Sequence, residues 1–144
     1  MRTMAVVKQA GVVGAQRYVT ALHDAMAGHP TAAFVTYYTV QEIQSRGMTP
    51  ILQDGAGVLV WNHGDGRIEA GGLFSTGGGA GMALLKQVIA QYHVNYVEAF
   101  EPLNKMYEEL GFHTQNQDAW DDKYAPSSWN YAAHGTPSVH YMVR

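Results

Sequence analysis

Apolar positions along the chain change their spacing several times, and each spacing predicts a different element. The run from Met4 to Val7 is short and apolar, as in a first strand. From Gly14 to Met26 the apolar residues recur at intervals of three and four, as on one face of a helix, and Gly28 ends that pattern. A shorter helix is predicted over residues 40–44, where Thr39 is suited to be the N-cap.

A meander of strands is predicted next, because β-rich runs alternate with turn signals. Segments 54–57 and 63–66, which contain Asp-Gly and Gly-Asp-Gly, mark the turns. The predicted strands cover residues 51–53, 58–62 and 67–74. Gly71 and Gly72 interrupt the third strand, and paired glycines within a strand predict a bulge or a backbone open to a ligand.

The pattern then becomes strand, glycine loop and helix. Small residues fill 76–81, an amphipathic helix follows as far as Tyr92, and 94–100 is predicted to be a strand. A strand, helix and strand of these lengths form a βαβ unit, whose strands are parallel. Residues 101–112 predict another helix, with a proline in its first turn and a glycine after its end. The remainder is predicted to be loop, apart from a final strand at 138–143.

Composition limits the classes of protein that fit this pattern. The 144 residues suit one domain covering 1–144, and 15% charged residues with a net charge of −3 do not favour a nucleic-acid partner. There are no cysteines, and the seven histidines show no compact ligand spacing, so we expect no metal site. No apolar run is long enough to span a membrane and no convincing signal peptide is present, so we expect a cytoplasmic protein.

The glycine loop is a candidate anion site. The first amide groups of a helix lack partners within the helix, the helix dipole adds positive charge there, and glycines let a phosphate approach. Neither G-x-G-x-x-G nor a Gly-Lys-Ser/Thr ending is present in Gly77-Gly78-Gly79-Ala80-Gly81-Met82, which excludes the dinucleotide and nucleoside-triphosphate loops. A glycine-rich turn with no ligand is the alternative.

Two motifs resemble the GNAT superfamily of acyl-CoA-dependent N-acyltransferases. The first is the spacing [Q/R]-x-x-G-x-[G/A] at 76–81, with Thr76 where the family has Gln or Arg. The second is the ending Y-E-x-x-G-F of the helix after the next strand. Its matching residues are Tyr107, Glu108, Gly111 and Phe112, whereas Phe100 and Leu103 replace the family's Asn and Ala. Compact, divergent chains of this kind with a Trp-rich end also resemble ones encoded by bacteriophages.

The resemblance implies a mixed α/β fold: an antiparallel meander, then the βαβ unit, with a splayed central sheet flanked by helices. Acetyl-CoA would be the cofactor. Its pyrophosphate would bind the loop amides, and its pantetheine arm would follow the backbone at the end of the third strand. The cofactor-binding residues would be Leu73, Phe74, Thr76, Gly77, Gly78, Gly79, Ala80 and Gly81.

The resemblance also implies catalytic residues. Tyr107 would protonate the departing thiolate, although its place on an apolar helix face equally suits packing. Glu69, on the strand before the loop, would be the general base. Glu98 and Asp65 compete for that role, each of the three carboxylates could simply be solvated, and water alone accepts the proton in some family members.

The aromatic residues near the C-terminus allow several interpretations. Trp120, Tyr124, Trp129 and Tyr131 could line an acceptor pocket, form a homodimer contact or cover an open sheet. Acidic neighbours at 118, 121 and 122 favour a cationic acceptor, such as a polyamine or lysine.

These observations leave two functional hypotheses. The first is an N-acetyltransferase acting on a small-molecule or protein amine. The second, supported by the departures at Thr76 and Phe100, is a GNAT-like binding or inhibitory module without catalytic activity.

Overall fold

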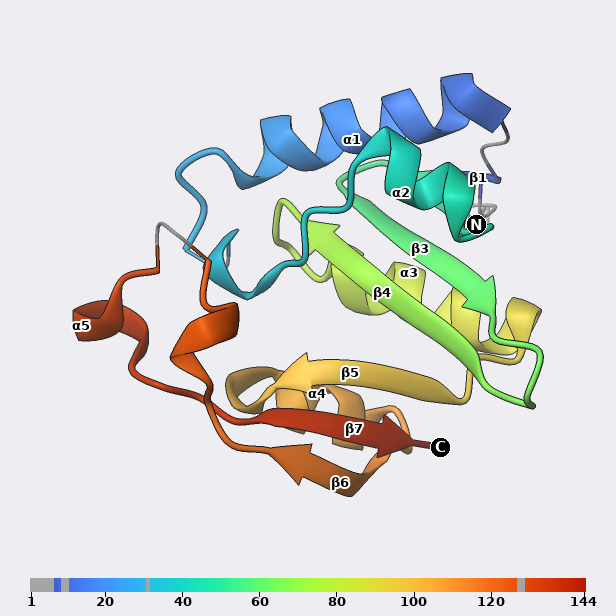
Figure 1. The fold of residues 1–144 in the computed structure, drawn as a ribbon. Helices are drawn as coiled ribbons and strands as arrows, with labels where there is room; N and C mark the ends of the chain where they lie inside the picture. The colour runs from blue at the N-terminus through green and yellow to red at the C-terminus, as the bar shows by residue number, and fades with distance from the viewer. Residues whose placement is uncertain (1–6, 9–10, 31, 127–128) are drawn as a thin grey trace. The chain divides into compact units, whose positions relative to one another are not determined.

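A computed structural model describes residues 7–8, 11–30, 32–126 and 129–144 (Figure 1). The chain forms two compact units, Met1–Asn95 and Tyr96–Arg144, which are described in turn.

The first unit contains an antiparallel sheet in the order β1-β2-β3-β4. Its strands are β1 (Val7–Lys8), β2 (Thr49–Gln53), β3 (Ala56–Asn62) and β4 (Ile68–Ser75). Short turns join β2 to β3 and β3 to β4, at the two places where the glycine-containing signals predict them. The predicted meander is therefore confirmed, whereas most of the first predicted strand, 4–7, lies outside the described residues.

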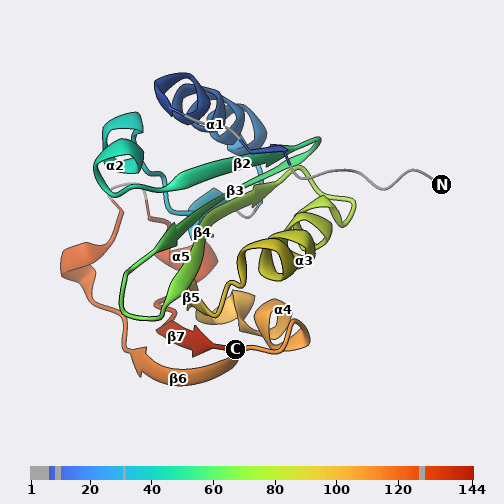
Figure 2. The ribbon, with the colours of Figure 1, turned by 90° about the vertical axis from the view of Figure 1, so that its right-hand side faces the viewer.

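Helices cover both faces of this sheet. Helices α1 (Gly11–Met26) and α2 (Val40–Ser45) lie on one face, and α3 (Ala80–Tyr92) lies on the other (Figure 2). A short 3-10 helix, η1 (Ala32–Phe34), lies between α1 and α2. Because β3 is covered on both sides, its sequence is an almost continuous apolar run, and every residue of it except Asn62 is buried.

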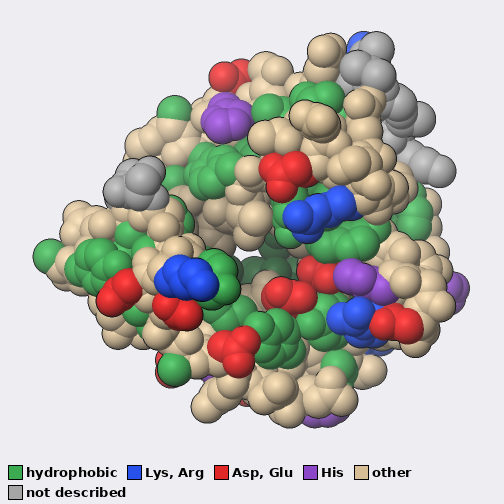
Figure 3. Space-filling model, in the orientation of Figure 1, with side chains coloured by type: hydrophobic (Ala, Val, Ile, Leu, Met, Phe, Trp, Pro, Cys, Tyr) green, Lys and Arg blue, Asp and Glu red, His purple; other side chains and the backbone are tan. Residues whose placement is uncertain are grey.

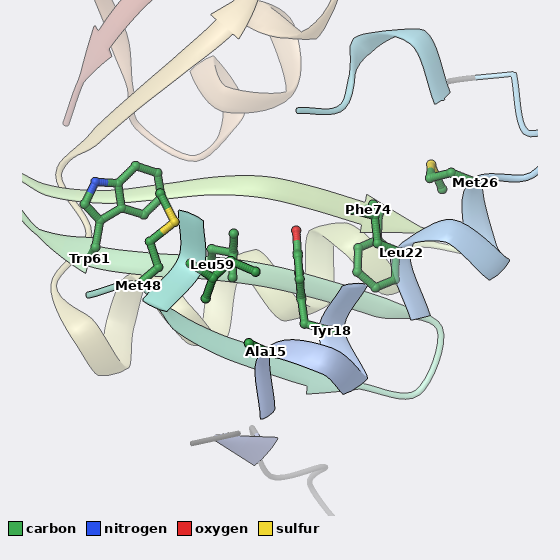
Figure 4. Close-up of a cluster of buried hydrophobic side chains, with 9 residues drawn as sticks. Ala15, Tyr18, Leu22, Met26, Met48, Leu59, Trp61 and Phe74 are labelled. Atoms are coloured by element: carbon green, nitrogen blue, oxygen red, sulfur yellow. The ribbon is translucent and has the colours of Figure 1, made fainter. Parts of the chain in front are cut away.

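The two helices on the first face form as the sequence predicts. Thr39 accepts a hydrogen bond from the Glu42 amide, and the Glu42 carboxylate accepts one from the Thr39 amide, which completes a capping box. Tyr18 and Leu22 project from α1 onto Leu59 and Phe74 of the sheet (Figure 4). All four side chains are buried, so α1 is held mainly by apolar packing.

The second unit contains a three-stranded antiparallel sheet in the order β5-β7-β6. The strands are β5 (Tyr96–Phe100), β6 (His113–Asp118) and β7 (Val139–Val143). On one face, Val97, Ala99 and Met142 are buried. Helix α4 (Asn104–Glu109) adds the buried Tyr107 and follows a 3-10 turn, η2 (Glu101–Leu103). Along the chain, two short helices, η3 (Asp122–Tyr124) and α5 (Tyr131–His134), follow β6 and precede β7.

Two sequence predictions for this unit were incomplete. Residues 101–112 were predicted to be one helix, but its first turn is the 3-10 helix η2 and α4 ends at Glu109. Strand β6 was not predicted at all. Its six residues are polar and exposed, so it shows no apolar alternation and forms because β7 supplies hydrogen-bond partners. The parallel pairing of β4 with β5 stays a prediction.

Candidate functional site

The glycine loop between β4 and α3 has a left-handed backbone at three consecutive residues. The φ angles of Gly77, Gly78 and Gly79 are +113°, +66° and +80°. Residues with a Cβ rarely adopt such angles, so this conformation requires glycine. A Cβ built on any of the three would meet no atom within 4 Å. The outer side of the loop is therefore open.

Part of the loop is satisfied by the protein itself. The Thr76 amide donates to the carbonyl of Gly55 at 2.8 Å. The Ser75 hydroxyl accepts hydrogen bonds from the amides of Gly77 and Gly81, at 3.0 Å and 3.1 Å. These bonds hold the loop against the turn between β2 and β3, the end of β4 and the start of α3.

Other amides of the loop are available. Within the described part of the chain, the amides of Gly78, Gly79 and Met82 donate to no group, whereas Ala80 donates to the Gly77 carbonyl at 3.3 Å. Gly79 is the N-cap of α3, so these amides lie at the positive end of its dipole. The backbone amides of residues 76–81 were all predicted to bind the diphosphate. In this conformation only those of Gly78 and Gly79 are unpaired among the described residues, and the Met82 amide adds a further donor. Unpaired amides on an open surface fit a diphosphate.

Just before the loop, β4 has the predicted bulge. The register passes from Gly57 opposite Phe74 to Leu59 opposite Gly71, so two residues of β4 oppose one residue of β3. Gly72 lies in this bulge with φ of +60°.

The bulge is supported from α1. The Tyr18 hydroxyl donates to the Gly72 carbonyl, and a Cβ at Gly72 would collide with that hydroxyl. Burial raises the pKa of Tyr18, which keeps its proton available for the bond. Leu73 is half-buried and Phe74 is buried beside Tyr18, with ring centroids 5.5 Å apart. Their predicted contacts with pantetheine stay a prediction.

Glu69, the predicted base, is buried and has a histidine partner. Its Oε1 lies 2.7 Å from His63 Nε2, and its side chain is only 7% exposed compared with 24% for His63. His63 also lies beside the Trp61 ring, with ring centroids 5.8 Å apart. Glu69 and His63 therefore form a pair with a buried carboxylate and a partly exposed imidazole.

The role of His63 was missed in the sequence. A signal for it exists: His63 begins the predicted turn at 63–66, Glu69 follows that turn, and the His63 amide donates to the Arg67 carbonyl at 3.0 Å. Glu69 is opposite Trp61 in the ladder, which makes His63 and Glu69 diagonal neighbours.

The competing carboxylates have other partners. Asp65 accepts hydrogen bonds from Arg67 Nε at 3.0 Å and 3.2 Å, and these bonds hold the pKa of the Asp65 carboxyl below its usual value. Glu98 accepts a hydrogen bond from the Tyr96 hydroxyl at 3.0 Å and is exposed. Among the described residues, no three His, Asp or Glu side chains gather as a metal-ligand set.

Tyr107, the predicted acid, is 5% exposed on α4. Its ring meets Phe112 edge-on with centroids 5.9 Å apart. The side chain therefore contributes to the core of the second unit, and its role as a proton donor stays a prediction.

Comparison with solved structures identifies the fold. The chain resembles a GNAT-family acetyltransferase from Streptococcus pneumoniae, with a TM-score of 0.58, 11% identity, and coverage of 97% of this chain and 98% of that one. An N-acetyltransferase from Staphylococcus aureus Mu50 matches with a TM-score of 0.53, 12% identity and the same coverage. The predicted mixed α/β fold is thus confirmed as the fold of the GNAT acetyltransferases.

Sequence comparison adds no closer relative. No family model matches the chain, and a search of curated proteins gives no match. In the part of the chain that the structure describes, no helix is both long and apolar enough to cross a bilayer.

Proposed function

We propose that the chain is an N-acyltransferase that uses acetyl-CoA as its acyl donor and an amine as its acceptor. One observation carries the proposal. In a chain with the GNAT fold, the helix start that follows β4 presents unpaired amides at Gly78, Gly79 and Met82 on an open loop. This arrangement supports the binding of a diphosphate-containing donor.

The loop would bind the cofactor through its backbone. The amides of Gly78, Gly79 and Met82, together with the positive end of the α3 dipole, would hold the diphosphate. The Ser75 hydroxyl keeps the neighbouring amides in place through its two hydrogen bonds. When bound, acetyl-CoA supplies a thioester carbonyl that an amine can attack.

His63 and Glu69 would accept the proton of the amine. With the Nε2 hydrogen directed at the Glu69 carboxylate, Nδ1 is the basic nitrogen of the ring. A proton taken at Nδ1 makes an imidazolium, which the buried carboxylate stabilises. The Glu69 predicted from the resemblance would then act through His63, as the group that orients and stabilises the base.

Tyr107 would supply a proton to the leaving thiolate, as the resemblance implies. Replacing it with Phe removes the hydroxyl and retains the ring against Phe112. We expect Tyr107→Phe to lower kcat more than it raises KM. Tyr92→Phe is the control, because Tyr92 is a half-buried tyrosine of α3. This change should leave both constants unaltered. Unchanged turnover in Tyr107→Phe would restrict Tyr107 to packing.

The proposal is tested by binding and then by turnover. Calorimetry should detect binding of acetyl-CoA to the purified protein, and an assay for free thiol should detect CoA release with at least one amine from a panel. Absence of binding at millimolar acetyl-CoA would refute the proposal.

The alternative of a binding module without catalysis is supported by Thr76. Its side chain and its amide are both directed at the Gly55 carbonyl, at 3.3 Å and 2.8 Å. Binding of acetyl-CoA without thiol release across the panel would favour this alternative.

A further inference from the structure

The second unit contains an open pocket of about 540 Å³. Its floor is one face of the β5-β7-β6 sheet. Glu98 lies opposite Tyr141, and Val139 lies opposite both Phe100 and Asp118, so these side chains share that face. Residues 119–121 and 124–126 form the rest of the lining. Side chains from three strands and one connecting segment therefore meet around one space.

The charged side chains that line this pocket are all acidic, and the neighbouring Lys123 lies over the Tyr124 ring, 5.5 Å from its centre, without forming an ion pair with any described residue. The lining includes Glu98, Asp118 and Asp121 but no Lys, Arg or His. Within the described residues, none of these three carboxylates forms an ion pair. The partners they do have are neutral: Tyr96 donates to Glu98 at 3.0 Å, and the Lys123 backbone amide donates to Asp121 at 3.0 Å.

Tyr141 keeps the third carboxylate in place. Its hydroxyl donates to Asp118 Oδ2, and this bond, with partial burial and the charge of Glu98, raises the pKa of Tyr141 to about 12. The phenol therefore remains a neutral donor at physiological pH, so this partner of Asp118 adds no positive charge to the pocket.

Aromatic rings complete the lining. Trp120 is fixed by its Nε1 bond to Asp122 at 2.6 Å and by stacking on the buried Trp129, with ring centroids 4.7 Å apart. Tyr124 is 76% exposed, and the ammonium group of Lys123 already lies 5.5 Å from the centre of its ring. Figure 3 shows acidic, basic and hydrophobic side chains next to one another in the region of η3 and α5. Rings beside carboxylates attract ammonium groups through both cation–π and ionic contacts.

The spacing of the carboxylates favours an extended ligand. β7 lies between β5 and β6, so Glu98 and Asp118 are on strands about 10 Å apart. They are also offset by two residues along the sheet, which adds about 7 Å in the strand direction. One ammonium group cannot contact both, whereas a chain with separated ammonium groups can.

We propose that this pocket binds a linear aliphatic polyamine, with one ammonium group at Glu98, another at Asp118 and the methylene chain against Phe100 and Trp120. The carboxylates supply the charge, and the rings cover the methylene groups between the charged ends. The binding rests on the second unit alone. That the bound polyamine is the acyl acceptor rests on the function proposed above.

The test is calorimetric titration of the full chain with spermidine in the absence of acetyl-CoA. We expect binding that weakens as salt is raised, and no binding of 1,8-octanediol, a neutral chain of similar length. In the double variant Glu98→Gln, Asp118→Asn, affinity should fall at least about tenfold, because both charge contacts with the ligand are removed. The amide oxygen that Asp118→Asn introduces can still accept the Tyr141 hydrogen bond, so the fold should remain.

Glu109→Gln is the matched control, because Glu109 is an exposed carboxylate of the same unit outside the pocket lining. It should leave spermidine affinity within about twofold. No binding of spermidine at low salt would overturn the proposal, as would an unchanged affinity in the double variant or an equal loss in Glu109→Gln. Spermidine binding without acetyl-CoA binding would refute the proposed enzyme and leave the polyamine site standing.

Discussion

The glycine loop and the acidic pocket are built by different means. The loop uses backbone groups from residues consecutive in sequence, 75–82, and its left-handed glycines can be recognised in the sequence. The pocket uses side chains from β5, β6 and β7, which are separated by up to about forty residues in sequence. A site made by one helix start can therefore be predicted from a local motif, whereas a pocket on a sheet face depends on strand pairing.

The largest effect is expected from blocking the glycine loop. Gly79→Glu places a charged side chain on its open side, and we expect acetyl-CoA affinity to fall at least about 100-fold because a carboxylate repels the diphosphate. Spermidine binding should be unchanged, since the pocket lies in the second unit. Calorimetry with each ligand measures both effects.

Gly64→Glu is the matched control for this change. Gly64 has φ of +81°, against +80° for Gly79, and a Cβ at either would meet no atom within 4 Å. The backbone strain of the two variants is therefore similar, and Gly64→Glu should keep its affinity for acetyl-CoA. Equal losses in both variants would attribute the effect to strain.

The next largest effect is expected at the His63–Glu69 pair. Glu69→Gln removes the charge that stabilises the imidazolium, and we expect kcat to fall about 100-fold. His63→Gln should cause a similar loss, and the double variant should be no worse than either single one, because the two groups act as a unit. Steady-state kinetics over a range of pH is the measurement. Losses that multiply in the double variant would contradict the pairing.

A smaller effect should follow from removing the support of the bulge. Tyr18→Phe leaves the Gly72 carbonyl without its buried donor, and we expect the free energy of unfolding to fall by about 1–3 kcal/mol. Tyr37→Phe is the control, because Tyr37 also donates to a carbonyl, that of Ala32 at 2.8 Å, but is 39% exposed. Urea titration of both variants should show the larger loss for Tyr18→Phe. A larger loss in Tyr37→Phe would contradict the burial argument.

The smallest effect is expected at Asp122, which accepts a hydrogen bond from the pocket residue Trp120. Hydrogen bonds from Trp120 and Tyr131 lower the pKa of Asp122 from its ordinary value of 3.8. A depressed pKa means that the stabilisation is present above the unfolded value and is lost as pH falls through the folded one. Tryptophan emission should therefore change at a pH below 3.8, and this change should be absent in Asp122→Asn. Persistence of the same transition in that variant would assign it to another carboxyl.

Much of the fold could be predicted from local patterns. The helix over 14–26, the capping box at Thr39 and the meander from β2 to β4 all have short-range causes: apolar spacing, a side-chain cap and glycine turns. The glycines of the bulge also have a local signature, although their partner Tyr18 does not, because it is 54 residues away.

Local sequence patterns specify the elements whose residues interact with near neighbours, including the loop before α3. Which polar groups have partners depends on the tertiary structure. It paired His63 with Glu69, occupied the Thr76 amide with Gly55 and turned the polar segment His113–Asp118 into a strand. The physical reason is that hydrogen bonds and ion pairs depend on distance in space, and the folded chain brings together groups whose separation in sequence carries no pattern.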